Sequence, residues 1–468
     1  MSRVDPRRPG NVVLRRARVR PETVRIRVRR RRWSLRPSPW LLAGSFAGLI
    51  AVGTLLLSLP IAAESRDWTS GWTSLFTATS AVSVTGLVRV DTAEHWSGFG
   101  EVVILGLIQL GGLGVTMYMG ALVLIAGRRL GLTGRQFFGM ELAGGGDWDT
   151  GRLLRRVIIF TVTVETVTFL LLLPWFVDHG DDANAVWRAF FHAISAANNA
   201  GFDVQGGLAS FRGEVSSGYL LAVMGASAFV GSLSFVTVFN LRRRPRRWSL
   251  DTKFVVMGMG GLLILGIVLL TAGEVQQGRP LAGLGAVDVL ANGFFLSVQR
   301  TTGMSTIDMA GLRESTTAVL LVLMFIGGAS TSVAGGIKMG AFMVGIAVVV
   351  SSMRGRQRTE AFGREIPESI VLRAIAVVAL GLTTLAVGVW ALALADDVPF
   401  VSGVFEVMSA LANVGWSHGV TPTLTTTGAM ILVVLMYLGR VGPLMIALSV
   451  PERPRTTYRY PSEGVRIG

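Results

Sequence analysis

The sequence predicts an all-α polytopic membrane protein, in which four similar units surround a pseudo-fourfold axis and contribute eight membrane spans. Three observations predict this fold. First, the chain of 468 residues is 51% hydrophobic and only 16% charged, which is typical of a membrane protein rather than a soluble enzyme. Second, a short helical segment that ends in a glycine turn occurs four times. Third, blocks of arginine separate the units from one another.

The composition also excludes several kinds of site. The chain has no cysteine, so disulfides, iron–sulfur clusters and thiolate metal sites are excluded. The net charge of +15 lies in discrete arginine blocks, which indicates membrane topology and not the binding of nucleic acid. We therefore expect no cofactor in this chain. The four histidines are scattered without the spacing of metal ligands: His95, His179, His192 and His418.

Each recurring segment is an apolar helical run too short to cross a bilayer, which takes about 20 residues. Each run ends in small or polar residues and a glycine. The glycines follow one another at intervals of roughly 110 residues, which indicates an internal fourfold repeat. The predicted site residues in these segments are Ser83, Val84, Thr85 and Gly86; Asn198, Asn199, Ala200 and Gly201; Arg300, Thr301, Thr302 and Gly303; and Ala412, Asn413, Val414 and Gly415.

Such turns indicate cation chemistry. Irregular backbone at membrane depth is tolerated only where it lines a cavity or is buried in protein. Four segments around one axis can direct carbonyl oxygens at a dehydrated cation, and each short helix directs its partly negative C-terminal end to the same place. Glycine is needed because adjacent carbonyls face the same way only if one residue leaves the ordinary φ region. The alternative is a set of re-entrant packing turns in another kind of transporter, and the fourfold recurrence favours a pore with a selectivity filter.

Each unit then consists of a span, a pore helix, a filter loop and a second span. The paired spans are expected near 39–61 and 98–127, 153–177 and 215–240, 253–273 and 316–351, and 368–395 and 427–449. The domain boundaries place a basic arm at 1–37, pore repeats at 38–127, 152–241, 252–352 and 367–450, and a tail at 451–468. The first apolar run is longer than the apolar core of a signal peptide, so we interpret it as an uncleaved span.

Arginines orient the spans. They cluster in the linkers between the repeats and in residues 1–36, which contain 14 arginines. Because positive charge stays on the cytoplasmic side, the linkers and both termini are predicted to be cytoplasmic, and the chain to lie in the cell membrane. Acidic residues gather on the opposite side, where they attract cations to the mouth of a pore. The basic arm is expected to contact anionic membrane lipid or to dock a partner subunit.

The glycine segments carry a resemblance to a known family. The four filter loops of the Trk/Ktr/HKT potassium transporters match Ser-Val-Thr-Gly-Leu at 83–87, Asn-Ala-Gly-Phe-Asp at 199–203, Arg-Thr-Thr-Gly at 300–303 and the Val-Gly turn after Phe-Glu at 405–406. The chain resembles these proteins over roughly residues 38–450. Because the first span runs directly into the first pore helix, the chain is more similar to the Ktr-type subunit.

The resemblance implies potassium uptake through a channel-like pore, with potassium in the filter as the only metal ion. It also implies a homodimer with one pore per protomer. A soluble nucleotide-binding regulatory ring is expected on the cytoplasmic side as a separate polypeptide.

Glycines interrupt the second span of the third repeat. At about 1 kcal/mol lost for each helical glycine, the run from Gly327 to Lys338 is expected to unwind at membrane depth. The resemblance implies an intramembrane gate loop below the filter, with Arg440 projecting into the same cavity; a glycine-rich helix-packing face is the alternative. The predicted gate residues are Gly327, Gly328, Ala329, Ser330, Thr331, Ser332, Gly335, Gly336, Lys338 and Arg440.

Charged side chains at membrane depth need partners. An arginine at the position of Arg440 costs at least about 2.5 kcal/mol on insertion scales, so it is expected to face protein or water. Lys338 is expected either to snorkel or to touch the partner of the gate loop. Glu165 is interpreted as a structural partner of a helix end or a basic group and not as a proton relay.

The leading hypothesis is passive, channel-like potassium uptake that the membrane potential drives and a separate subunit regulates. Sodium- or proton-coupled potassium symport is the alternative, and a reversal potential that follows potassium alone would separate the two. A membrane enzyme is disfavoured because the sequence shows no nucleophile–base set or metal cluster at membrane depth. A pump subunit would need an associated ATPase.

Overall fold

The computed structural model describes residues 39–113, 150–179, 184–208, 210–330 and 332–449. The predicted basic arm, the predicted tail, most of the linker between the first two repeats and the gate residue Thr331 lie outside the described residues.

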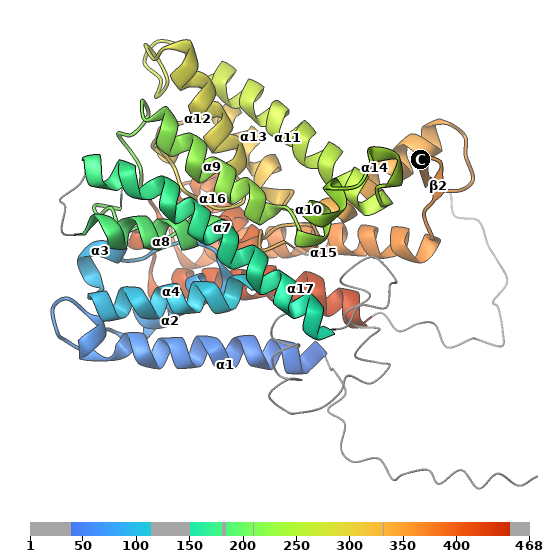
Figure 1. Ribbon diagram of the computed structural model, residues 1–468. Helices are drawn as coiled ribbons and strands as arrows, with labels where there is room; N and C mark the ends of the chain where they lie inside the picture. The colour runs from blue at the N-terminus through green and yellow to red at the C-terminus, as the bar shows by residue number, and fades with distance from the viewer. Residues whose placement is uncertain (1–38, 114–149, 180–183, 209, 331, 450–468) are drawn as a thin grey trace, which may run out of the picture. The chain divides into compact units, whose positions relative to one another are not determined.

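Helices make up almost all of the regular secondary structure of the described residues, and they fall into four consecutive groups (Figure 1). The helices of the first group are α1 (Pro39–Ser58), α2 (Gly71–Ser83), α3 (Thr92–His95) and α4 (Gly98–Gly112). Those of the second are α7 (Thr150–His179), α8 (Ala185–Ala197), α9 (Gly218–Ser232) and α10 (Phe235–Leu241). Those of the third are α11 (Leu250–Glu274), α12 (Ala286–Gln299), α13 (Glu314–Phe325) and α14 (Met339–Met353). Those of the fourth are α15 (Glu368–Ala395), α16 (Phe400–Ala412) and α17 (Thr426–Ser449).

The remaining regular elements are short. Strands β1 (Glu360–Ala361) and β2 (Arg364–Glu365) pair as an antiparallel hairpin between α14 and α15. The 3-10 helices among the described residues are η1 (Pro60–Ala62), η2 (Pro245–Arg247), η3 (Met309–Gly311) and η4 (Thr421–Thr423).

Serine side chains account for the start of several helices. Ser70 accepts the backbone N–H of Thr73 at the start of α2, and Ser249 accepts that of Thr252 at the start of α11. A hydroxyl at this position satisfies one of the N–H groups that a helix leaves without an intrahelical partner. The local sequence therefore determines where these two helices begin.

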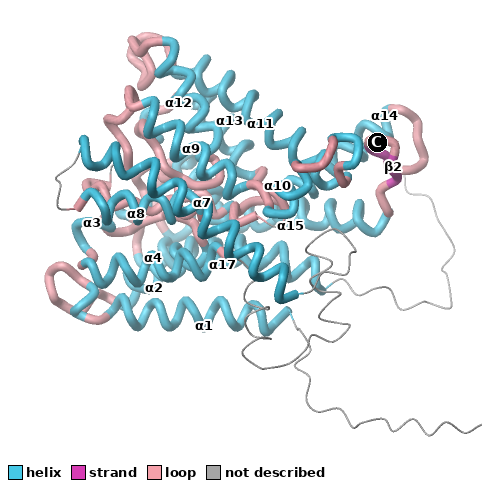
Figure 2. The backbone as a smooth tube through the Cα atoms, in the orientation of Figure 1, coloured by secondary structure: helices cyan, strands magenta, loops and turns pink. Residues whose placement is uncertain are grey.

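The short helices α2, α8, α12 and α16 lie at the centre of the bundle, and the residues of their C-terminal halves are mostly buried. Each packs against a long helix of its own group. In each group, an apolar helix that follows the glycine turn also contacts the short helix of the next group, since α4 contacts α8, α9 contacts α12, α13 contacts α16 and α17 contacts α2. The contacts between groups therefore close into a cycle. Figure 2 shows loop segments between the helices inside the bundle as well as at its ends.

The longest helices expose apolar side chains on the outside of the bundle. Only 17% of the most apolar window of α7 is buried, and only 11% of that of α15. Large side chains such as Leu170, Trp390 and Leu394 are exposed. A soluble monomer rarely exposes so much continuous apolar surface, whereas a bilayer covers it with hydrocarbon.

Three described helices, α7, α11 and α15, are long and apolar enough to cross a membrane by length and composition. The pair α9 and α10 makes a fourth candidate, although the two helices meet at 99°. The other apolar helices of the described residues are shorter, and α4 ends beside residues outside the description. The eight spans therefore stay a prediction.

The bend between α9 and α10 differs from the single span expected near 215–240. Gly231 lies directly before Ser232, the last residue of α9, so a residue that weakens a helix stands at the bend. A tertiary contact lies at the same place, because the carbonyl oxygen of Ser232 accepts the N–H of Ala329 from the third group at 3.0 Å. Ser234 then caps α10 by accepting the N–H of Thr237.

The predicted span 316–351 is also in two parts, and here the glycines predict the interruption. Helix α13 ends at Phe325 and α14 begins at Met339. We call residues 326–338, which connect them, the α13–α14 loop.

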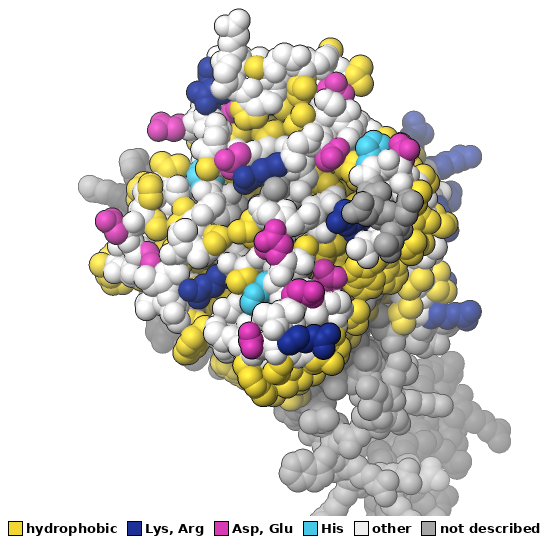
Figure 3. Space-filling view, turned by 90° about the vertical axis from the view of Figure 1, so that its left-hand side faces the viewer, with side chains coloured by type: hydrophobic (Ala, Val, Ile, Leu, Met, Phe, Trp, Pro, Cys, Tyr) yellow, Lys and Arg dark blue, Asp and Glu magenta, His cyan; other side chains and the backbone are white. Residues whose placement is uncertain are grey.

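The two ends of the bundle carry different charges. At one end, where Figure 1 shows α10, α14 and β2, the two arginine-rich linkers contact each other. Arg364 donates to the carbonyl of Trp248 at 3.4 Å, and Lys253 lies 5.3 Å from the centre of the Phe362 ring. Figure 3 views the opposite end, where acidic side chains are spread over the face with some Lys and Arg side chains among them.

Candidate functional site

The four predicted glycine turns meet in a ring. All four glycines have a positive φ, from +73° to +106°. A β-carbon on any of them would lie 2.1–2.5 Å from the carbonyl oxygen of the residue that precedes the glycine of the next turn. The four contacts run from Gly86 to Ala200, from Gly201 to Thr302, from Gly303 to Val414 and from Gly415 to Thr85. Both the backbone conformation and the close approach therefore require glycine.

The first, second and fourth turns are built in the same way. After α2, α8 and α16 comes a residue in the left-handed conformation: Val84, Asn199 or Asn413. The next N–H bonds back across the end of the helix, as Thr85 bonds to the carbonyl of Ser80 at 2.8 Å. This Schellman arrangement ends the helix and reverses the chain just before the glycine.

The third turn has a different geometry. Arg300 has a φ of −54° and continues the helical conformation of α12. The N–H groups of Thr302 and Gly303 both bond to the carbonyl of Gln299, each at 2.8 Å. The third glycine thus reaches the ring without a left-handed residue before it.

Asparagine side chains connect neighbouring turns. The Nδ2 of Asn199 donates to the hydroxyls of Thr301 at 3.1 Å and of Thr302 at 2.8 Å. The Nδ2 of Asn413 donates to the hydroxyl of Thr85 at 3.0 Å. The asparagines of the second and fourth turns therefore hold the threonines of the third and first turns.

A serine precedes each glycine at the same distance, but its role differs between the groups. Ser80 and Ser409 accept the N–H of the glycine in their own turn, at 3.1 and 3.0 Å. Ser195 donates to the carbonyl of Phe202, just after its glycine, at 2.6 Å. Ser297 instead donates to a backbone carbonyl of α11 at 3.0 Å, so it supports the third short helix and not its turn.

Two predicted filter residues have side chains that bond outside the ring. The Nδ2 of Asn198 donates to Glu165 at 2.8 Å and to Gln109 at 3.0 Å. Glu165 thus bonds to the residue at the C-terminal end of α8, and its partner there is a carboxamide and not a basic group. Arg300 bonds to backbone carbonyls near the end of α13. In the first turn, the hydroxyl of Ser83 lies 2.6 Å from the hydroxyl of Thr85.

The α13–α14 loop is closed at its base. The N–H of Gly327 bonds to the carbonyl of Ile337 at 2.9 Å, and the N–H of Ile337 bonds to the carbonyl of Phe325 at 3.0 Å. The Nζ of the half-buried Lys338 donates to the carbonyl of Ala334 at 2.6 Å. The loop is therefore a compact unit with its own internal support.

This loop packs against the fourth glycine turn and the last helix. A β-carbon on Gly335 would lie 2.1 Å from the carbonyl oxygen of Ala412, so the loop touches the end of α16. Arg440 in α17 donates to the carbonyl of Val333 at 2.6 Å and to that of Gly111 at 2.8 Å. Arg440 therefore connects the loop to the end of α4.

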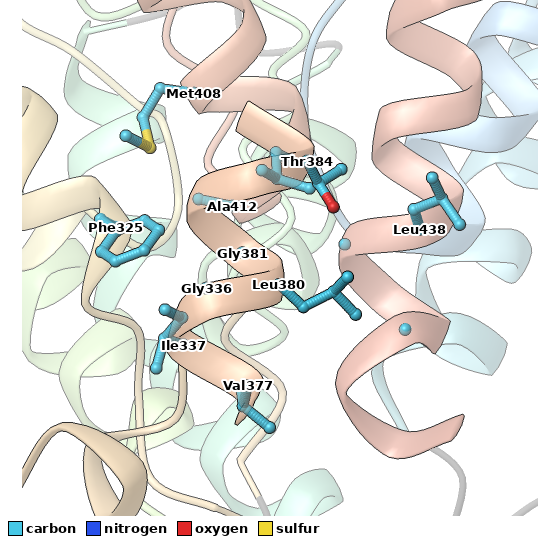
Figure 4. A pocket seen from close by; sticks show the side chains of 13 residues that line it. Phe325, Gly336, Ile337, Val377, Leu380, Gly381, Thr384, Met408, Ala412 and Leu438 are labelled. Atoms are coloured by element: carbon cyan, nitrogen blue, oxygen red, sulfur yellow. The ribbon is translucent and has the colours of Figure 1, made fainter. Parts of the chain in front are cut away.

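An apolar pocket of about 100 Å³ lies beside the loop, between α13, α15, α16 and α17 (Figure 4). Figure 4 shows Phe325 and Ile337 on one side of it and Leu438 on the other, with Leu380 between them. Such a lining offers no oxygen ring for a dehydrated cation, whereas the four carbonyls beside the glycines do. The glycine ring is therefore the candidate ion site.

Sequence reasoning missed two acidic residues that support the turns. The buried carboxylate of Glu406 accepts hydrogen bonds from Ser417 at 2.6 Å, from the N–H of His418 at 3.0 Å and from Thr421 at 2.5 Å. It thereby holds the chain that follows the fourth glycine. A signal was present, because Glu406 precedes its glycine by the same distance as His192, the other ionisable residue at this position.

The second acid is Asp203, which follows Gly201 by two residues. Burial and, to a smaller extent, the nearby carboxylate of Asp91 raise the pKa of the Asp203 carboxyl to about 6, because both effects disfavour the charged form. Asp203 is thus an ionisable group next to the ring. Among the described residues, no cluster of three or more His, Asp or Glu side chains is able to hold a metal ion.

A helical bundle with an apolar exterior and a central ring of backbone carbonyls defines a membrane transport protein. The chain belongs to the TrkH family of cation transport proteins, which matches residues 49–455. The predicted membership in the Trk/Ktr group is thereby confirmed, and members of this family are transporters and not enzymes.

Relatives and a solved structure agree with this assignment. The chain is 34% identical to the Ktr system potassium uptake protein B of Bacillus subtilis, over 93% of this chain and 98% of that protein. It is 33% identical to the potassium/sodium uptake protein NtpJ of Enterococcus hirae, over 92% of this chain and 96% of that protein. Its fold is similar to the crystal structure of the potassium transporter TrkH from Vibrio parahaemolyticus, with a TM-score of 0.68, 16% identity, and coverage of 90% of this chain and 86% of that one.

Proposed function

We propose that this chain takes up potassium across the cell membrane through a pore whose selectivity filter is the glycine ring. The observation that carries the proposal is the closed cycle of contacts among the four turns, which brings four backbone carbonyls together around one axis. The carbonyls are those of Thr85, Ala200, Thr302 and Val414. Such oxygens replace the water shell of a dehydrated cation, and the C-terminal ends of four short helices add negative potential there.

The wider architecture of the pore is part of this proposal. Four units of span, pore helix, filter loop and span surround the axis, with eight spans, cytoplasmic termini and an acidic outer mouth. The cyclic contacts between consecutive groups and the apolar surfaces of α7 and α15 support it. The arginine-rich linkers at the end of the bundle away from the acidic face support the orientation.

We propose further that the α13–α14 loop is the gate and that the structure represents its closed state. Arg440 holds the loop through the carbonyl of Val333 and places a positive charge below the filter. At an effective dielectric constant near 20, two like charges about 6 Å apart repel each other by about 3 kcal/mol. Steric closure and repulsion would then act together on a cation that leaves the filter.

A separate cytoplasmic nucleotide-binding ring and a homodimer complete the proposed assembly. In the β1–β2 hairpin region, Arg356 and Arg358 already pair with Glu360 and Glu365. The linker before α11 is therefore the more available basic surface for an acidic partner: Arg242, Arg243, Arg244, Arg246 and Arg247. Binding should weaken as salt shortens the Debye length from about 8 Å at 0.15 M to about 3 Å at 1 M. Binding that is independent of salt and of these arginines would indicate an apolar interface.

The test of the function is ion flux into liposomes that contain the purified chain, with and without the regulatory subunit. We expect uptake of radioactive rubidium that potassium inhibits and sodium does not, and a reversal potential that follows potassium alone. Sodium uptake equal to rubidium uptake would overturn the assignment.

Sodium-coupled symport is the second candidate, and one observation favours it: a relative with 33% identity is named a potassium/sodium uptake protein. In the same liposomes, coupling would make the reversal potential depend on the sodium gradient at constant potassium. Proton coupling would make it depend on the pH gradient.

A further inference from the structure

Arg300 lies behind the third glycine turn and is only 2% exposed. Its Nη1 donates to the carbonyls of Leu323, at 3.2 Å, and of Ile326. Its Nη2 contacts the sulfur of Met259 at 3.5 Å. Among the described residues, no carboxylate forms a salt bridge with Arg300. Backbone carbonyls therefore balance the charge of this guanidinium.

These carbonyls belong to the end of a broken helix. Because α13 stops at Phe325, its last carbonyls have no intrahelical partner, and the partial negative charge of the helix end lies inside the bundle. A guanidinium carries several donors on one planar group, so the Nη1 of Arg300 bonds to both carbonyls while its Nη2 contacts Met259. Arg300 satisfies two of the carbonyls and sets a positive charge against the helix dipole.

The same contact holds the base of the α13–α14 loop. Ile326 directly precedes Gly327, whose N–H closes the loop on Ile337. On its other side, Arg300 continues into Thr301 and Thr302, which bond to an asparagine of the second turn. One side chain thus connects the third turn of the ring to the point where the loop leaves α13.

No other turn has this connection. The residues at the corresponding positions of the first, second and fourth turns are Ser83, Asn198 and Ala412, none of which is basic. We propose that Arg300 is a positioning residue that couples the gate to the filter, by holding the base of the loop closed against the third turn. The proposal rests on the α13–α14 loop being the gate of the proposed function.

The first test is Arg300→Lys, which keeps the charge and loses the planar guanidinium whose Nη1 reaches both carbonyls while its Nη2 contacts Met259. In liposomes without the regulatory subunit, rubidium uptake should rise roughly tenfold, the change that follows from about 1.4 kcal/mol of lost loop closure. The matched control is Arg313→Lys at the opposite end of the same helix, where Arg313 bonds to Gln276. The control should leave uptake unchanged.

The same substitution in a second variant distinguishes a loss of coupling between loop and turn from a general structural defect. In a chain that lacks residues 329–334, we expect rubidium uptake to be high already. Arg300→Lys should then raise uptake by less than about twofold, because the effects of interacting residues are not additive. An equal rise in both backgrounds, or no rise in the full-length chain, would overturn the proposal. So would a loss of rubidium preference over sodium without any rise in uptake, which would make Arg300 a filter residue only.

A labelling experiment tests the contact without measuring transport. The chain contains no cysteine, so Ser332→Cys places a single thiol in the loop. Arg300→Lys should increase the rate at which a charged thiosulfonate modifies this thiol by roughly tenfold, and Arg313→Lys should not. If Arg300→Lys speeds labelling but the wild-type protein conducts sodium as well as rubidium, the proposed function is rejected and the coupling is retained. Unchanged labelling rejects the coupling whatever the ion.

If the lysine variant aggregates, amide hydrogen exchange on the wild-type chain decides instead. The N–H groups of Gly327 and Ile337 close the base of the loop and should exchange as slowly as those inside α13. Exchange as fast as that of exposed turns would show that Arg300 does not hold the base, and would overturn the proposal.

Discussion

The third glycine turn differs from the other three in how the helix before it ends and in what lies behind it. The first, second and fourth turns use a left-handed residue and a Schellman bond. The third continues α12 through Arg300, and its serine bonds away from the turn. All four nevertheless deliver a glycine with positive φ to the same ring. The ring thus constrains the glycine, while the support behind each turn is free to vary.

The helix that packs behind each turn explains why the third turn differs from the other three. In three groups this helix approaches the end of its short helix through a glycine, on which a β-carbon would lie 2.0–2.2 Å from a backbone carbonyl. These contacts run from Gly111 to Val82, from Gly231 to Ala197 and from Gly439 to Leu411. In the third group α13 ends beside the C-terminal end of the short helix α12, and the Arg300 guanidinium bonds to carbonyls at the end of α13.

The largest expected effect tests whether the third glycine is equivalent to the others. Gly303→Ser and Gly86→Ser should each lower the ratio of rubidium to sodium uptake at least tenfold, about 1.4 kcal/mol, because a β-carbon meets the next carbonyl at 2.3 and 2.5 Å. Gly283→Ser is the control, since Gly283 also has a positive φ but has open space around it. A selective Gly303→Ser protein would show that the third turn does not belong to the filter.

The next effect concerns the α13–α14 loop of the third group. Removal of residues 329–334, or Arg440→Ala, should raise uptake without the regulatory subunit more than tenfold, because a hydrogen bond to a charged group contributes about 2 kcal/mol. Competition by sodium should stay as in the wild type, since the filter is unchanged. Unaltered uptake after the deletion would identify the loop as a packing element.

A smaller effect sharpens the contrast between serines. Ser409→Ala removes the acceptor of the Gly415 N–H and should lower the ratio of rubidium to sodium uptake a few-fold, since a neutral hydrogen bond contributes about 1 kcal/mol. Ser297→Ala removes a bond to α11 and should lower only the thermal stability. Equal losses of selectivity in both variants would show that support of the short helix, and not the bond to the glycine, matters.

The smallest effect depends on pH and on the second turn alone. The carboxyl of Asp203, with a pKa of about 6, is charged at pH 7.5 and neutral at pH 5, so the mouth loses negative charge as the outside is acidified. The KM for rubidium should rise about twofold, because a single partly exposed charge changes the local free energy of a cation by a fraction of a kcal/mol. Asp203→Asn should abolish this pH dependence. If the dependence survives in that variant, another group is responsible.

Local signals account for the parts of the molecule that the sequence predicts well. Short apolar runs end in glycine at one period, so the four turns and the helices α2, α8, α12 and α16 follow from pattern alone. Glycines between Gly327 and Gly336 likewise predict the interruption between α13 and α14, because each lowers helix stability. Neither inference needs knowledge of distant contacts.

Local sequence signals do not predict the direction of a side chain or its partners from distant parts of the chain. Arg300 adjoins the third turn in sequence, which favours a role in the ring, but the position of the α13 end determines where its guanidinium bonds. At the bend after Ser232, the carbonyl of Ser232 accepts a hydrogen bond from Ala329, almost a hundred residues later in the chain. Asn198 similarly bonds to Glu165 because α7 brings that acid to the end of α8.

The ring is built from one chain, and this has a consequence for how its parts can change. In an assembly of four identical chains, an arginine behind one turn or a break in one helix would occur four times. Here each quadrant has its own residues, so the third carries a broken helix and Arg300 while the fourth carries Glu406. Four non-identical segments of one polypeptide thus combine a shared backbone geometry in the ring with different supports behind each turn, and a single substitution is able to alter one support at a time.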